Sequence, residues 1–176
     1  MATFHRGDIE LYYETHGSGY PVLLIAPGGM RSAIPLWANA PWNPVEQLAR
    51  SYRVIVMDQR NAGRSRAPIR ADDGWHVYRD DQLALLDHLG IDTFHAGGMC
   101  IGGSFVMGLV AAAPERVTTG VLFQTIGRST GPEDNGQAFY DMYDGWARAL
   151  APSRPDVTAA DWAGLRSAMY DGDYLF

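Results

Sequence analysis

Short apolar runs alternate with segments of helical spacing between residues 9 and 123, and this alternation limits the fold more than any other feature. Strands are predicted at 9–16, 22–26, 52–57, 93–96 and 117–123, and helices at 44–50, 75–89 and 101–113. Parallel neighbours need helical crossovers, so this order predicts a mostly parallel α/β sheet flanked by helices. Gly17-Ser18-Gly19 separates the first two strands as a hairpin-like break would.

The pattern changes beyond Gly127, which predicts two regions: 1–128 as a sheet-containing core and 129–176 as an incomplete helical cap segment. Helical spacing in the second region is carried by Phe139, Met142, Tyr143, Trp146 and Leu150. Further on, Thr158 and Asp161 resemble a capping box at the start of another helix.

Charge and composition exclude several classes of protein. With 14 basic and 20 acidic residues the chain has a formal charge of −6 and no basic cluster, so no nucleic-acid partner is expected. It has neither a secretion-signal pattern nor an apolar run long enough to span a membrane, which predicts a cytoplasmic protein with no membrane association. Its single cysteine excludes an internal disulfide and a multi-cysteine zinc site, and neither a metal nor a cofactor is expected.

That cysteine, Cys100, lies in Gly98-Met99-Cys100-Ile101-Gly102, between a predicted strand and a predicted helix. Glycines on both sides permit a sharp turn that projects the thiol away from the sheet, and the N-terminus of the next helix favours a thiolate. A buried, inert cysteine is the simpler alternative, but the flanking glycines favour a nucleophile. Phosphate binding fails on spacing, because Met99 and Ser104 stand where the two phosphate-loop motifs need glycine and lysine.

Two further segments, together with the elbow, resemble the α/β-hydrolase fold family. Residues 22–30 (VLLIAPGGM) are similar to its third strand and oxyanion loop, and residues 54–65 (VIVMDQRNAGRS) to its fourth strand and D-x-R-G-x-G-x-S loop. Pro27 and Asn61 depart from the usual histidine and glycine of these motifs. The resemblance implies an oxyanion hole formed by backbone N–H groups of Ile101 and of Gly29 or Met30.

A general base for Cys100 is missing from the expected site. His95 precedes it by five residues, about 16 Å along a strand, and the other four histidines fit structural or surface roles better. Asp58 and Arg60 are expected to stabilise their loop rather than to react. The family resemblance implies an acid and a histidine after later strands; Gln124 stands where some members carry the acid, so the C-terminal strands are expected beyond Phe176.

The same gap predicts a partner. Val121, Leu122 and Phe123 would form an unpaired apolar edge if the sheet ended there, and such edges recruit another strand. We therefore expect a C-terminal fragment of the same protein to supply the remaining strands, the acid and the histidine.

The resulting prediction is a hydrolase that acts on a small-molecule ester, thioester, lactone or amide through an acyl-cysteine intermediate. A cysteine in place of serine at the elbow is similar to the arrangement in dienelactone hydrolases. An acyltransferase is the alternative, because residues 99–103 also resemble the cysteine elbow of polyhydroxyalkanoate synthases. A non-catalytic protein that binds a small molecule among the cap aromatics Phe139, Tyr143, Trp146 and Trp162 is a third interpretation.

Overall fold

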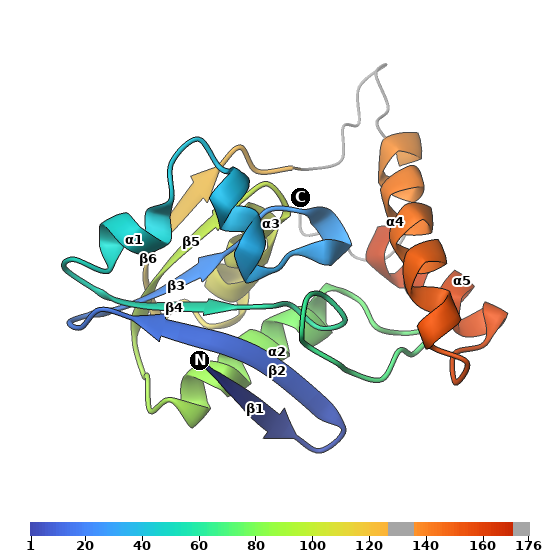
Figure 1. Cartoon of the computed structure of the whole chain (residues 1–176), viewed down its shortest axis with the longest axis horizontal. Helices are drawn as coiled ribbons and strands as arrows, with labels where there is room; N and C mark the ends of the chain where they lie inside the picture. Colours follow the sequence, from blue (N-terminus) through green and yellow to red (C-terminus); the bar gives the residue numbers. More distant parts are fainter. Residues whose placement is uncertain (127–135, 171–176) are drawn as a thin grey trace.

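A computed structural model describes residues 1–126 and 136–170. In it, six strands form one mixed sheet in the order β1-β2-β4-β3-β5-β6 (Figure 1). The strands are β1 Ala2–Arg6, β2 Ile9–His16, β3 Pro21–Ile25, β4 Arg53–Met57, β5 Phe94–Met99 and β6 Val117–Phe123. The last four in space, β4-β3-β5-β6, are parallel, whereas β1 and β2 are antiparallel to their neighbours. The predicted α/β class with a mostly parallel sheet is confirmed.

Two features of the N-terminal strands differ from the prediction. β1 was missed, because Phe4 is its only large apolar residue and most of the strand is exposed. The hairpin connects β1 to β2 across Gly7, whose φ of +58° suits a tight turn. The hairpin-like interpretation of residues 17–19 is wrong, because β4 lies between β2 and β3.

Alternation along the strands divides the core between the two faces of the sheet. One face packs Leu23, Ile25, Ile55 and Met57 against α2 (Trp75–His88) and α3 (Ile101–Ala112). The opposite face packs Val22, Leu24, Val54 and Val56 against α1 (Pro44–Leu48) and Trp37 of the 3-10 helix η2 (Ile34–Asn39). All three α-helices were predicted to within two residues.

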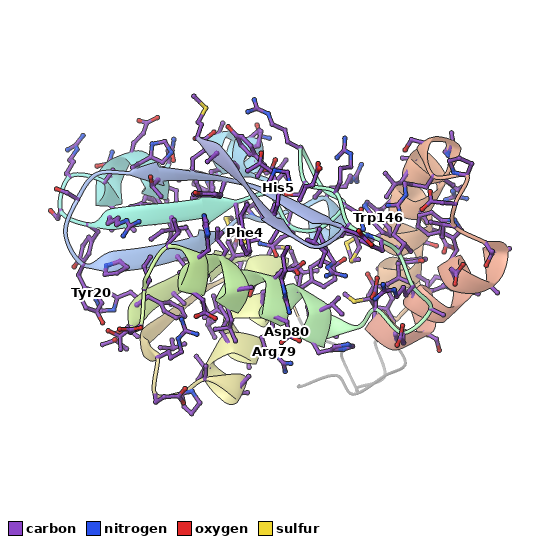
Figure 2. All side chains as sticks on the ribbon, turned by 90° about the horizontal axis from the view of Figure 1, so that it is seen from below. Phe4, His5, Tyr20, Arg79, Asp80 and Trp146 are labelled. Atoms are coloured by element: carbon purple, nitrogen blue, oxygen red, sulfur yellow. The ribbon has the colours of Figure 1, made fainter. Side chains whose placement is uncertain are left out.

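The cap consists of α4 (Gly136–Leu150), the 3-10 helix η3 (Ala151–Ser153) and α5 (Ala159–Tyr170), which lie together beside one end of the sheet (Figure 1). Trp146 of α4 belongs to the same apolar cluster as the α2–α3 side of the core and is placed where the cap meets the sheet domain (Figure 2). The predicted capping box is confirmed: the Asp161 N–H donates to Thr158 Oγ1 (3.1 Å), and the Thr158 N–H donates to Asp161 Oδ2 (3.0 Å). The predicted boundary at 128/129 and the Phe139 side chain lie outside the described residues.

At the other end of the strand order, β6 pairs with β5 alone among the described strands. Residues 118–122 of β6 are exposed, including Val121 (42%) and Leu122 (44%). An apolar sheet edge of this kind is the expected site of further strand pairing.

Candidate active site

Cys100 lies between β5 and α3 in a backbone conformation that L-residues rarely adopt, with φ +57° and ψ −120°. Two hydrogen bonds hold this turn. The Cys100 N–H donates to the Phe123 carbonyl (2.9 Å), and the Cys100 carbonyl accepts from the Gly103 N–H (3.0 Å). The side chain is partly exposed at the N-terminus of a 12-residue helix. A strained, partly exposed residue at such a position suits a reacting group better than a packing role.

The flanking glycines are required by close packing. A β-carbon on Gly98 would collide with the Gly102 carbonyl, and one on Gly102 would collide with the Ile25 carbonyl. Neither glycine has a positive φ, so the constraint is space rather than backbone angle. These contacts bring the N-terminus of α3 directly against the end of β3.

The predicted oxyanion loop follows β3 and enters the 3-10 helix η1 (Gly29–Arg31). Gly28 and Gly29 have φ values of +117° and +60°. The turn is held by the Arg31 N–H, which donates to the Gly28 carbonyl (3.1 Å), and by Ser32 Oγ, which donates to the Ala26 carbonyl (2.7 Å). The glycines in this segment therefore serve a specific left-handed turn.

Sheet register places this loop beside the elbow. Ile25, the last residue of β3, pairs with Gly98 of β5, so the residues that follow each strand emerge at the same edge of the sheet. Gly29 and Met30 continue from one strand, and Cys100 and Ile101 from the other. The N–H groups of Ile101 and of Gly29 or Met30 are the predicted oxyanion donors, whereas the Cys100 N–H is already donated to the Phe123 carbonyl. In the part of the chain that the structure describes, no cluster of three or more His, Cys, Asp or Glu side chains is suited to a metal ion.

Asp58 and Arg60 stabilise their own surroundings, as predicted. Asp58 accepts from the N–H groups of Ile34 and Arg64, both at 2.8 Å. The buried Arg60 donates to Asp81 through Nε (2.8 Å) and Nη2 (3.1 Å). Burial by itself lowers the pKa of Arg60, but the Asp81 carboxylate outweighs it and raises the pKa. The guanidinium thus stays charged and joins its loop to α2 through Asp81.

Four of the five histidines make contacts away from the elbow, and the fifth is exposed on α2. The His95 ring lies between Tyr20 (4.8 Å between centroids) and Tyr52 (5.9 Å) on the α1 side of the sheet. His88 stacks on Phe4 at 4.6 Å, on the surface of α2. The remaining three are placed as follows: His16 bonds Glu14 (3.0 Å), His5 lies 3.8 Å from Glu10, and His76 is exposed on the first turn of α2. None of these contacts involves the elbow.

Two cap residues contact loops next to the elbow, and neither was predicted as a site residue from the sequence. Met142 of α4 lies against Gly29, and Arg154, just after η3, binds Asn61. Met142 was expected only as part of a helical apolar stripe. The departure of Asn61 from the usual glycine was the one local signal that this loop has an additional contact.

Comparisons with known proteins identify the fold family. A family model described as the alpha/beta hydrolase fold matches residues 21–167. RutD of Azorhizobium caulinodans, which carries the name of a carbamate hydrolase, is 39% identical over 117 residues, covering 66% of this chain and 42% of that protein. The 2-hydroxymuconate semialdehyde hydrolase of a Pseudomonas species is 34% identical over 114 residues, covering 64% of this chain and 39% of the relative.

Among solved structures, the enol-lactonase from Burkholderia xenovorans LB400 matches 98% of this chain with a TM-score of 0.64 and 22% identity. Est816, described as an N-acyl homoserine lactone degrading enzyme, matches 97% with a TM-score of 0.61 and 26% identity. The matches cover 69% and 70% of those two chains, and less than half of the curated relatives above. No helix in the described ranges, 1–126 and 136–170, is long and apolar enough to cross a membrane. The family model spans most of the sequence and the fold agrees with it, so the chain belongs to the α/β hydrolase fold family.

Proposed function

We propose that this protein is a hydrolase that cleaves a small acyl compound, such as an ester, thioester, lactone or amide, through a covalent intermediate on Cys100. The observation that carries the proposal is the strained backbone of Cys100 at the N-terminus of α3, beside the glycine loop that follows β3. The hydrolase names of its relatives support the reaction class.

The proposed reaction has two steps. The Cys100 thiolate attacks the carbonyl carbon, forming a C–S bond, and the N–H groups of Ile101 and of Gly29 or Met30 stabilise the negative charge on the oxygen. Collapse of this intermediate breaks the bond to the leaving group, which takes up a proton. Water then attacks the thioester and breaks the C–S bond, releasing the carboxylic acid and restoring the thiol.

The second step needs a base that the histidine contacts above do not provide. We propose that a C-terminal segment of the same protein, outside these 176 residues, supplies the acid and the histidine and pairs with β6. The exposed apolar side chains of Val121 and Leu122 support this, as does the greater length of the relatives.

Mass spectrometry tests the proposal on the chain itself. After incubation with p-nitrophenyl acetate or a phenyl thioester, we expect one acyl group per chain, removable by neutral hydroxylamine and located on the peptide that contains Cys100. Because the chain has a single cysteine, Cys100→Ala removes every thiol and should abolish the adduct. Acylation that persists in Cys100→Ala, or wild-type protein that stays unmodified by both reagents, would contradict it.

A turnover assay tests the proposed partner separately. The 176-residue chain should acylate once and release acid slowly, whereas a longer protein that includes the next strands should turn over many times. Rapid multiple turnover by the 176 residues alone would exclude the need for such a segment. An added alcohol acceptor that ends up in the product would identify an acyltransferase instead.

A further inference from the structure

Two apolar side chains pack against the glycines of the proposed oxyanion loop. A β-carbon on Gly28 would collide with Cδ1 of Leu36, and a β-carbon on Gly29 would collide with Sδ of Met142 and stand 3.2 Å from its Cγ and Cε. Leu36 belongs to η2 of the core, whereas Met142 belongs to α4 of the cap. One glycine is therefore packed by a core side chain and the next by a cap side chain.

The contact at Met142 belongs to a wider packing of α4 on η1. The two elements are in direct contact, and the side chain of Met30, which is 1% exposed, shares a buried cluster with Tyr143 and Trp146 of α4. The loop thus depends on the cap both through its backbone, at Gly29, and through its side chain, at Met30.

A methionine suits this place chemically. Its thioether is apolar and flexible, and it has no hydrogen to donate, so it can fill the space above Gly29 without competing as a donor for a developing oxyanion. It also excludes water, which strengthens any interaction between an N–H group and a negative charge. An oxyanion hole stabilises its charge only when the donors are already oriented.

We infer that Met142 is a positioning residue: by seating on Gly29 it holds the 28–30 loop in the orientation that presents its N–H groups beside Cys100. Docking of the cap and completion of the oxyanion hole are then a single event, and displacement of α4 leaves the loop with its own hydrogen bonds and Leu36 but without the side chain that packs on Gly29. The catalytic role of Met142 rests on the proposed function, whereas the coupling between cap and loop rests only on the packing of Met142 against Gly29.

Amide hydrogen exchange tests the coupling without any substrate. In Met142→Ala we expect peptides covering residues 27–33 to exchange roughly tenfold faster than in the wild type. Met142→Leu, which keeps the apolar volume, should restore slow exchange. Leu150→Ala is the matched control, because Leu150 is a partly buried apolar residue at the C-terminal end of α4 and is not among the side chains nearest to Gly28 or Gly29. It should loosen the helix end while leaving residues 27–33 unchanged.

Acylation kinetics provide the second readout. Met142→Ala should lower the maximal rate at which p-nitrophenyl acetate acylates Cys100 by about tenfold, with little change in the concentration that gives half-maximal rate. If Met142 has a purely structural role, Met142→Ala and Leu150→Ala should accelerate the exchange of residues 27–33 to the same extent and lower the maximal acylation rate to the same extent.

The failures of the two proposals are distinguishable. Unchanged exchange of residues 27–33 in Met142→Ala overturns the positioning role even if wild-type Cys100 is acylated. Accelerated exchange together with an unreactive wild-type Cys100 supports the coupling and contradicts the proposed hydrolase.

Discussion

Arg154 of the cap binds Asn61 of the core: its Nη1 donates to Asn61 Oδ1 (3.0 Å) and to the Ala67 carbonyl (2.8 Å). Asn61 Oδ1 also accepts from the Ala67 N–H at 3.0 Å. Asn61 is 6% exposed and has a φ of +57°, a region that asparagine tolerates better than most residues. The asparagine that replaces the usual glycine therefore keeps the left-handed turn and adds an attachment point for the cap.

Replacing this asparagine should weaken the cap attachment. We expect Asn61→Gly to lower the free energy of unfolding by about 1–2 kcal/mol, because relief of the positive φ is smaller than the loss of hydrogen bonds from a charged donor and a buried N–H. Asn61→Asp keeps the acceptor and should retain most of the stability. Urea denaturation measures both variants, and an Asn61→Gly protein more stable than the wild type would contradict the role of this contact.

The elbow glycines should be far less tolerant of alanine than a glycine of the cap. Gly98→Ala or Gly102→Ala places a methyl group against a backbone carbonyl and should cost about 3 kcal/mol or prevent folding. Gly145→Ala is the matched control: it lies inside α4 with no atom within 4 Å of the added carbon, and should gain about 0.5–1 kcal/mol. Thermal unfolding followed by circular dichroism compares all three, and equal tolerance would refute the packing argument.

Removing the strain at Cys100 should stabilise the protein. At φ +57° and ψ −120° a glycine is unstrained, so Cys100→Gly should be about 1–2 kcal/mol more stable than Cys100→Ala, although both variants lose the thiol. Calorimetry on the two variants isolates the backbone term because neither can form the proposed acyl intermediate. Equal stability would mean that the elbow stores no strain.

The stability of the cap should depend on acid pH. Hydrogen bonds from Thr158 hold the pKa of Asp161 below its ordinary value of 3.8, and those from Arg154 lower the pKa of Asp156. Since the folded-state pKa values are depressed, these contributions are present above the unfolded pKa and are lost as the pH falls through the folded pKa. Proteolysis of the cap should therefore accelerate below about pH 4. Asp161→Asn should reduce this pH dependence, and an unaltered profile would argue against the capping box as its source.

Most of the core could be predicted from the sequence because its signals are local. Apolar runs identified five of the six strands, and the glycine spacing located the Cys100 turn. β1 was missed because an exposed edge strand with one large apolar residue lacks the alternation that burial imposes. The pairing of β2 was also misjudged, since strand order depends on contacts between distant segments.

The candidate site divides in the same way. The candidate nucleophile and the candidate oxyanion loop could be named from their motifs, because each motif reflects the backbone angles that one turn requires. The contacts of Met142 with Gly29 and of Arg154 with Asn61 join residues more than 90 positions apart, and nothing in either local sequence specifies its partner.

The sequence by itself thus determined the α/β core, the cysteine elbow and the glycine loop. Short-range sterics and the periodicity of burial depend on residues that are close together in the sequence. Only the tertiary structure decided that β4 lies between β2 and β3, that β1 forms an edge of the sheet, and that Met142 and Arg154 of the cap contact Gly29 and Asn61. Those outcomes depend on strand order and on side chains packing across elements, which are properties of the folded chain as a whole.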